Sequence, residues 1–588
     1  MSLIAQKFLM QANQAAQEGR RAEAIDLMRQ AIIHEPDIAF LHLKLGFFLQ
    51  SHGDIASAVE AFQTSMLFDP KAAATLLHCI TGMRGPIPPN WELATRQALQ
   101  EHRPNDADWQ LQLGLVMQEA HDVDAAIACF TRAANVGSVE GLNNLATALK
   151  ARGEIDAAMA AHDRAIALRP DDPVIAGNRL YTLLYHPDFD SQAILREHLE
   201  WAKRFADPLT TAAAIFANSR EQIRKLRIAY ISPDFRNHCQ TFFTLPLFRA
   251  LDRSQIELYC YSDVPTRDEA TKRLRELADH WREIAEQPDE AVANLIREDH
   301  IDVLIDLSLH MANNRLLVFA RRAAPVQLTC IAYPGTSGLS AMDIRLTDPQ
   351  LDPPGEHDAD YAERSVRLPE TFWCFDPMMD LPSGELPADQ NGFVTFGCLN
   401  NFCKVNDAVL DLWVQVLKSI EHSQLILLAP AGIARQHVSE RLAAGGIEAN
   451  RVEFFDRARR TPYFQAYAQI DIALDTFPYN GHTTTLDGLW MGVPVVTLVG
   501  KTVVGRAGLS MLSNVGLADL ATETPQEFVR LAVNLASDRV RLTELRKSLR
   551  TRVQQSPLMD ANKFARNIEA VYRSAFDAWR MKGDSRNS

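Results

Sequence analysis

From about residue 225 onward, short apolar runs alternate with longer stretches in which apolar residues recur at helical spacing. Strands that alternate with helices in this way predict an open parallel sheet. The alternation occurs twice, first as LRIAYISPDF (226–235), ELYCYSD (257–263), DVLIDLS (302–308) and VQLTCIAYP (326–334), then as GFVTFGCLN (392–400), QLILLAP (424–430), RVEFFD (451–456), IDIALDT (470–476) and VPVVTLV (493–499). We therefore predict two doubly wound α/β domains of Rossmann type, at residues 224–384 and 385–588, with closing C-terminal helices of which the last returns from Pro557.

The first 175 residues show a different pattern, an alanine-rich helical repeat. RRAEAIDLMRQAIIHEPD (20–37) aligns with GDIASAVEAFQTSMLFDP (53–70), and further units follow at 123–137 and 154–172. Small residues at matched positions let antiparallel helices approach closely, and a proline marks the turn into the next unit. Pairs 34 residues apart are Gly19 and Gly53, Ala24 and Ala58, Ala31 and Ser65, and Pro36 and Pro70, and Pro104 follows a degenerate unit with Trp91 and Ala94.

This repeat resembles the tetratricopeptide repeat family, because a generic helical bundle would not keep a fixed period with matched alanines and prolines. The resemblance implies an α superhelix at residues 1–175 whose groove binds proteins or peptides. Residues 176–223 are predicted to form a helical linker to the first α/β domain.

Polar residues follow several of the predicted strands directly. In doubly wound sheets, ligands bind beyond the carboxyl ends of the strands, so these residues are candidates for a binding site. They occupy positions 232–238, 308–315 and 333–338 in the first domain, and 400–404, 457–460 and 480–485 in the second. Two such domains facing one cleft form the GT-B arrangement, which many nucleotide-sugar transferases use.

The run NGHTTT (480–485) lies between two apolar segments, and the residues after it have helical spacing. Its threonine hydroxyls would meet the free amides of a helix N-terminus, which is a natural site for phosphate. Asp487, one turn further on, could accept hydrogen bonds from a ribose. Lys404 follows another strand of the same sheet and could neutralise a diphosphate as a point charge. By itself GHTTT would be a capped helix without a ligand; together with Lys404 it favours phosphate binding.

Four long motifs in the same order resemble the O-GlcNAc transferase family: PVQLTCIAYPGTSG, MDIRLTD, FGCLNNFCKVND and LDTFPYNGHTTTLDGLWMGVPVVT. With the leading repeats, the resemblance extends over nearly the whole chain. It implies an inverting, metal-independent transfer of a sugar, foremost GlcNAc from UDP-GlcNAc, to Ser or Thr hydroxyls of proteins that the repeats present. Other members of the family use UDP-glucose or GDP-fucose, so the sugar stays open. No cofactor is expected besides the nucleotide-sugar donor.

The resemblance also implies roles for individual residues. Near the acceptor, His238 matches a histidine proposed as general base, with a structural or acceptor-contacting histidine as the alternative. His310 matches a histidine of bacterial and plant relatives, although Leu309 replaces the usual glycine. The resemblance implies that Asn401 and Lys404 contact the diphosphate, and that His482, Thr483 and Thr484 surround phosphate. It implies that Asp487 holds the ribose and that the base lies by Ala458. The residues it implies near the sugar or acceptor are His310, Tyr333, Pro334, Gly335 and Thr336.

Several other features have simpler interpretations. Asp358-Ala359-Asp360 has the DxD pattern of metal-dependent transferases, but it follows a Pro-Gly loop and is predicted to be a solvated acidic turn. Residues 457–460 could contact phosphate or base, or form a solvated loop. Trp373 is expected in the core rather than in a sugar pocket. Tyr463 stands where animal enzymes place a base-contacting histidine, so base recognition is expected to differ.

Composition narrows the function further. A net charge of -14 argues against general nucleic-acid binding. The eight cysteines include no CxxC pair, which argues against a disulfide framework or a zinc site and suits a reducing compartment. There is no long uncharged apolar window and no signal-peptide pattern, so we expect a cytoplasmic protein without a membrane span. An inactive domain that senses a nucleotide sugar on a repeat scaffold, and transfer to asparagine, are the alternative functions.

Overall fold

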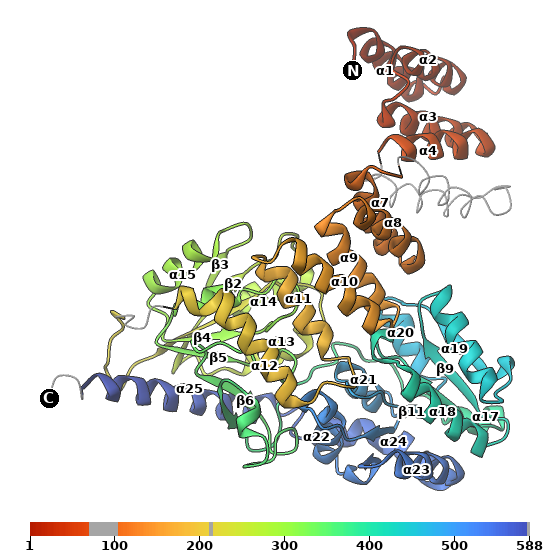
Figure 1. The fold of residues 1–588 in the computed structure, drawn as a ribbon. Helices are drawn as coiled ribbons and strands as arrows, with labels where there is room; N and C mark the ends of the chain where they lie inside the picture. The colour runs from red at the N-terminus through yellow and green to blue at the C-terminus, as the bar shows by residue number, and fades with distance from the viewer. Residues whose placement is uncertain (70–103, 211–215, 585–588) are drawn as a thin grey trace. The chain divides into compact units, whose positions relative to one another are not determined.

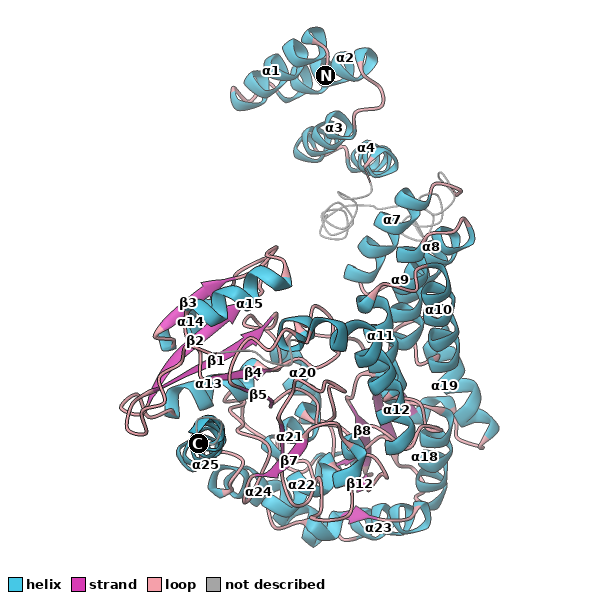
Figure 2. Ribbon diagram, turned by 60° about the vertical axis from the view of Figure 1, so that its left-hand side comes forward, coloured by secondary structure: helices cyan, strands magenta, loops and turns pink. Residues whose placement is uncertain are grey.

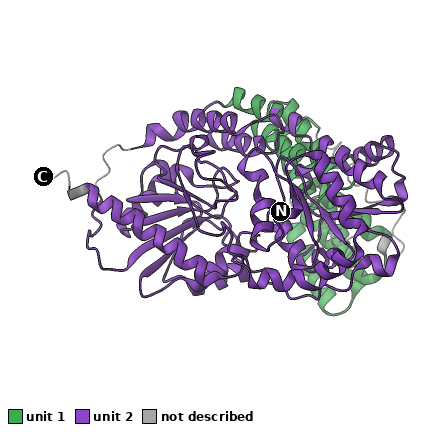
Figure 3. Ribbon diagram, turned by 90° about the horizontal axis from the view of Figure 1, so that it is seen from below, with its two compact units in different colours: residues 1–152, 160–169, 430–433 green, residues 153–159, 170–429, 434–588 purple. Residues whose placement is uncertain are grey.

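The computed structural model describes residues 1–69, 104–210 and 216–584. By their contacts these residues form two compact units, residues 1–152, 160–169 and 430–433 in the first, and 153–159, 170–429 and 434–588 in the second (Figure 3). Among the described residues, no helix is long and apolar enough to cross a membrane.

The first unit consists of antiparallel helix pairs. Glycine marks the closest approach within two of them, because a Cβ on Gly46 would lie 2.5 Å from the Phe62 ring and one on Gly114 would lie 2.4 Å from the Phe130 ring. Gly46 and Gly114 are 68 residues apart, as are Phe62 and Phe130, which is twice the predicted period of 34. The helices are α1 (Leu3–Gln17), α2 (Arg21–His34), α3 (Ala39–His52), α4 (Ile55–Phe68), α7 (Ala107–Glu119), α8 (Val123–Asn135) and α9 (Val139–Ala151), and α10 (Ile155–Leu168) crosses the unit boundary.

The small residues predicted at matched positions of these pairs lie in the helix interfaces. Ala24, Ala31, Ala58 and Ser65 are all fully buried. The helical repeat is therefore confirmed in the described part of the unit. Pro70, Trp91 and Ala94, which the sequence pattern assigned to the repeat, lie outside the described residues.

The second unit contains two parallel sheets. The first sheet has the strand order β3-β2-β1-β4-β5-β6-β7, and all its pairs are parallel. Helices α13 (Thr241–Ala250), α14 (Glu269–Leu277), α15 (Asp289–Glu298) and α16 (Leu316–Ala320) connect its strands (Figure 2). The strands are β1 (Leu226–Ser232), β2 (Ile256–Ser262), β3 (His280–Glu283), β4 (Val303–Asp306), β5 (Val326–Thr329), β6 (Ile344–Thr347) and β7 (Arg364–Arg367).

The second sheet repeats this topology with the order β10-β9-β8-β11-β12-β13. Its strands are β8 (Thr395–Cys398), β9 (Gln424–Leu428), β10 (Val452–Phe455), β11 (Ile472–Leu474), β12 (Val495–Leu498) and β13 (Ala521–Thr522). Its helices include α18 (Asp407–Ser419), α19 (Ile433–Ala444), α20 (Arg460–Tyr467), α21 (Thr483–Trp490), α22 (Ala507–Asn514), α23 (Pro525–Ser537) and α24 (Arg539–Gln555). Two doubly wound lobes are thus confirmed, both with the 3-2-1-4 order in which the winding reverses beside the first strand.

Helices that precede the first lobe in the sequence, and the C-terminal helix, also pack onto that lobe. In and just before the predicted linker at 176–223, α11 (Pro173–Leu183) and α12 (Ser191–Trp201) bury Leu180 and Trp201 against its strands. The C-terminal helix α25 (Ala561–Asp584) runs along the same lobe (Figure 1), and the hydroxyls of Tyr572 and Tyr230 on β1 are 2.7 Å apart. The predicted return of the last helix is therefore present.

Candidate active site

The candidate site lies at the points where the winding of the two sheets reverses. In the first lobe this point lies between β1 and β4, and in the second between β8 and β11. Loops that leave the carboxyl ends of these strands carry His238, His310, Lys404 and His482. Because such switch points form the ligand crevice of doubly wound sheets, the strand order supports the site chosen from the sequence.

Asp475, directly after β11, organises the turn that precedes α21. Its Oδ1 accepts hydrogen bonds from the Gly481 amide at 2.7 Å and from Asn400 Nδ2 at 3.1 Å, and its Oδ2 accepts one from the Thr497 hydroxyl at 2.7 Å. Asn400, which follows β8, also accepts a hydrogen bond from the Thr484 hydroxyl. These buried bonds join the loops after β8 and β11 into one rigid element.

Gly481 is required where this turn meets the helix. A Cβ at this position would lie 2.6 Å from Thr485 Oγ1, 2.7 Å from Thr484 Oγ1 and 2.9 Å from Asn400 Oδ1. The following helix, α21, begins at Thr483, and no side chain caps its N-terminus. Its first amides are thus left for another acceptor, which is the arrangement expected of a phosphate site.

Lys404 reaches the same turn from the loop after β8. Its Nζ donates a hydrogen bond to the Asn480 carbonyl at 2.6 Å and lies 4.1 Å from the centre of the Tyr479 ring. Burial lowers the pKa of Lys404 to about 8, against the opposing effect of nearby anionic groups such as Asp475. The side chain is still mostly charged at neutral pH, and burial makes it a good partner for an anion.

His482 completes this side of the site as a neutral group. Burial and the neighbouring Lys404 lower the pKa of His482 to about 3. Its ring packs against Tyr479 and, edge to face, against Trp373 at 5.9 Å. Trp373 is itself buried, as predicted. In the neutral ring Nε2–H donates to the Val504 carbonyl at 3.3 Å, so Nδ1 can accept a hydrogen bond from a ligand, but His482 cannot supply a second positive charge.

Asp487, predicted to accept hydrogen bonds from a ribose, already accepts hydrogen bonds from an arginine. It is buried, and both of its oxygens accept hydrogen bonds of 2.7 Å from the two terminal nitrogens of Arg460. Arg460 in turn lies 4.1 Å from the Phe242 ring of the first lobe. Of the cluster at 457–460, Arg460 thus lies half-buried where the two lobes meet, while Arg457 and Arg459 are exposed.

The first lobe brings His238 and Cys239 to the seam between the lobes. His238 Nδ1 is 3.6 Å from Asp234, and its Nε2 is 3.8 Å from Cys239 Sγ. Burial disfavours the imidazolium, but Cys239 and Asp234 outweigh this effect and raise the pKa of His238. The nearby Thr483, at the start of α21, also favours the thiolate form of Cys239 and so lowers its pKa. His238 therefore lies close to the predicted phosphate site.

His310 does not face this space. Its ring is fully buried, its Nε2 is 2.8 Å from the Ser337 carbonyl, and Trp201 packs edge to face against it at 4.7 Å. Burial lowers the pKa of His310 far below its ordinary value. The preceding Leu309 adopts φ +47°, so this leucine takes up the left-handed conformation that a glycine would adopt without cost.

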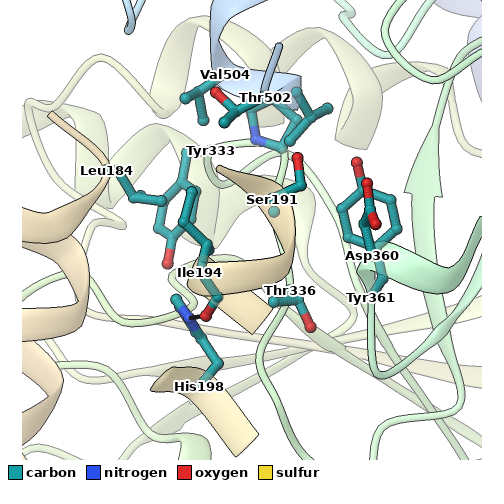
Figure 4. A pocket seen from close by; sticks show the side chains of 13 residues that line it. Leu184, Ser191, Ile194, His198, Tyr333, Thr336, Asp360, Tyr361, Thr502 and Val504 are labelled. Carbon is teal, nitrogen blue, oxygen red and sulfur yellow. Dashed lines mark hydrogen bonds between the residues drawn. The ribbon is translucent and has the colours of Figure 1, made fainter. Parts of the chain in front are cut away.

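Residues 333–336 line a pocket beside α12 (Figure 4). Ser191, Ile194 and His198 of α12 form one wall, and residues 502–504 of the second lobe form another. Within the loop, a Cβ on Gly335 would lie 2.7 Å from the Tyr333 ring, so only glycine fits there. The structure thus places this loop between α12 and the second lobe.

Two predicted donor contacts lie on exposed loops. Asn401 is exposed and Ala458 is exposed after β10, whereas Asn400 is buried in the hydrogen-bonded turn. Asn400, Asp475, Tyr479 and Arg460 are the residues that the motif comparison did not select. In the DxD sequence, Asp358 is exposed and pairs with Arg367, as predicted for a solvated turn, whereas Asp360 is half-buried, lies 3.1 Å from His357 and lines the pocket beside residues 333–336.

Residues 193–383 and 383–568 match the family described as Glycosyl transferase family 41. The chain belongs to glycosyl transferase family 41. A family 41 relative in Solanum lycopersicum, the probable UDP-N-acetylglucosamine–peptide N-acetylglucosaminyltransferase SPINDLY, is 37% identical over 428 residues, 71% of this chain and 45% of that protein. The SEC protein of Arabidopsis thaliana, with the same description, is 28% identical over 65% of this chain and 40% of its own length. The chain therefore spans about half the length of the curated relatives it matches.

A solved structure is similar over most of the chain. It is a lysine-to-methionine mutant of the Thermobaculum terrenum O-GlcNAc transferase, with a TM-score of 0.78, 33% identity, and coverage of 89% of this chain and 99% of that one. The resemblance to the O-GlcNAc transferase family inferred from the motifs is thus confirmed. The roles assigned to individual side chains stay predictions.

Proposed function

We propose that this member of family 41 transfers GlcNAc from UDP-GlcNAc to Ser or Thr hydroxyls of proteins, with inversion and without a metal ion. Its relatives in tomato and Arabidopsis are described as UDP-GlcNAc–peptide transferases. The observation that carries the proposal is the convergence of Lys404 and the uncapped start of α21 on one turn.

In the proposed reaction, the acceptor oxygen attacks the anomeric carbon as the bond to the diphosphate oxygen breaks. Lys404 and the amides of residues 483–485 stabilise the charge that develops on the departing diphosphate, which is the task of a metal ion in other transferases. His238 is the proposed general base because it directly precedes Cys239, which lies near Thr483, and its imidazole takes the proton of the acceptor hydroxyl. A phosphate oxygen of the donor is the other candidate for that proton.

The donor is proposed to lie along the second lobe, with Asp487 and Ala458 toward ribose and base, and with residues 333–336 toward the sugar or acceptor. The helical pairs of the first unit are proposed to bind the acceptor protein. We also propose a cytoplasmic location, because most of the described cysteines are buried thiols.

Mass spectrometry of products tests the proposal. The protein is offered UDP-GlcNAc, UDP-glucose and GDP-fucose in turn, with a library of Ser-, Thr- and Asn-containing peptides, in the presence and absence of EDTA. A GlcNAc adduct on Ser or Thr that persists in EDTA, and is lost in Lys404→Met, is the expected result. No adduct from any donor would favour a nucleotide-sugar sensor, and an asparagine adduct would correct the acceptor.

A further inference from the structure

The position of Lys404 depends on an aromatic surface as well as on a hydrogen bond. Its ammonium group is 2.6 Å from the Asn480 carbonyl and 4.1 Å from the centre of the Tyr479 ring. Both contacts come from the single turn between β11 and α21. An ammonium over a tyrosine face is attracted by the ring quadrupole, most strongly when it is shielded from water. The orientation of the Tyr479 ring therefore helps to set where the charge of Lys404 lies.

The Tyr479 ring is in turn held by a residue far away in the sequence. Tyr185, just after α11, stacks on it with 4.9 Å between ring centres and 10° between planes. Both rings are buried, with 5% of each residue exposed. The amide of Tyr185 donates to the Thr182 carbonyl at 3.1 Å, which fixes the stacking ring to the end of its helix.

The other contacts of Tyr185 lead toward the first lobe. Its hydroxyl donates to the Tyr181 hydroxyl at 2.8 Å, and the Tyr181 ring lies 5.4 Å from that of Tyr333, in the loop after β5. Tyr181 on α11 and Tyr185 just after it thus contact one loop of each lobe, the loop after β5 and the loop after β11. Neither Tyr181 nor Tyr185 lies within the residues that match family 41, which begin at 193.

We propose that Tyr185 is a positioning residue that holds the Tyr479 ring under Lys404 and so sets the lysine for contact with a nucleoside diphosphate. The inference rests on the proposed function, since it needs a diphosphate for Lys404 to meet. Loss of the stack leaves the Tyr479 ring free to turn and lets Lys404 move from its place beside the Asn480 carbonyl. Stacked aromatic pairs contribute enough to predict a loss of about 3- to 10-fold in diphosphate affinity.

The test is a double-mutant cycle on UDP affinity, measured by calorimetry on the full chain. Tyr185→Leu should weaken UDP binding about 3- to 10-fold, while Tyr185→Phe, which keeps the ring, should bind like the wild type. In a Lys404→Met background, Tyr185→Leu should have no further effect. Tyr185→Leu should weaken the binding of UMP, which lacks the second phosphate, less than it weakens the binding of UDP.

The controls separate positioning from general loss of structure. Tyr572→Leu removes an equally buried tyrosine on the far side of the first lobe and should leave UDP affinity unchanged. If Tyr185→Leu does not fold, Tyr479→Leu removes the other ring of the stack and should give the same loss and the same dependence on Lys404. Unchanged UDP affinity in Tyr185→Leu, or additive effects with Lys404→Met, would overturn the inference alone. Absence of UDP binding by the wild type would overturn the proposed function and the inference with it.

Discussion

We expect the affinity for UDP to depend on pH, because the pKa of Lys404 is about 8 rather than its ordinary 10.5. The ammonium is about 90% formed at pH 7 and about 10% formed at pH 9 by simple titration. A diphosphate binds the charged form, so its affinity is near its full value at pH 7 and below, and declines as pH rises through 8. Between pH 7 and pH 9 we expect the Kd for UDP to rise about tenfold.

The loss of UDP affinity at high pH cannot exceed the whole contribution of Lys404 to UDP binding. Hydrogen bonds to charged groups contribute about 1.5–3 kcal/mol, so Lys404→Met should raise the Kd for UDP about 10- to 150-fold at pH 7. The Lys404→Met protein should then show a flat profile from pH 7 to pH 9.5. Lys404→Arg keeps its charge over this range and should be flat as well, whatever its affinity at pH 7.

Other groups facing Lys404 must be kept from titrating in the same window. Crowding by protein atoms opposes ionisation of the Cys239 thiol, but His238 lowers its pKa below the ordinary value. The pH profile is therefore measured in a Cys239→Ala, Cys403→Ala background, while the neutral His482, with a pKa of about 3, does not change charge above pH 7. Calorimetric titration with UDP at half-unit pH steps gives the profile. An alkaline loss of the same size in Lys404→Met would refute this reasoning.

Two further substitutions test the framework of the site. Gly481→Ala should destabilise the protein and abolish UDP binding, because the added Cβ has no space. Gly488→Ala, within α21, meets only ordinary contacts from 3.4 Å and should be tolerated. Thermal unfolding and UDP titration compare the two variants. Arg460→Leu removes the ion-pair partner of the buried Asp487 carboxylate and should lower the free energy of unfolding by about 3 kcal/mol. Arg441→Leu breaks an exposed ion pair and should lower it by less than about 1 kcal/mol. Urea unfolding measures both variants, and equal losses would contradict the prediction.

The sequence pattern was sufficient for the architecture of the lobes but not for all of their strands. Runs such as DVLIDLS are apolar because both faces of a central parallel strand are buried. The strands β3 (HWRE) and β7 (RSVR) were not predicted, since they lie toward the sheet edges, are largely half-buried, and carry charged residues that hide the strand signal. Strand β6 (IRLT) is buried, yet its Arg345 pairs with Asp352 and masks an apolar run in the same way.

For the site, the rule that ligands bind beyond strand ends found the loops but could not choose among neighbouring side chains. Asn400 and Asn401 are equivalent in sequence, and only the path of the chain decides that Asn400 turns inward while Asn401 faces solvent. Asp487 could be placed near the helix start, but its pairing with Arg460 depends on the approach of α20. Tyr185 lies 219 residues before Lys404, and no local pattern connects them.

The path of α25 has a consequence for how the protein assembles on the ribosome. The first lobe ends its sheet at β7, near residue 367, yet the hydroxyl that partners Tyr230 belongs to Tyr572. About 200 further residues must emerge before that partner exists, and by then the second lobe is complete, since nascent domains form in the order of synthesis. The lobe made first is thus finished last, and a chain that loses its final helix would leave the Tyr230 hydroxyl of β1 without this partner.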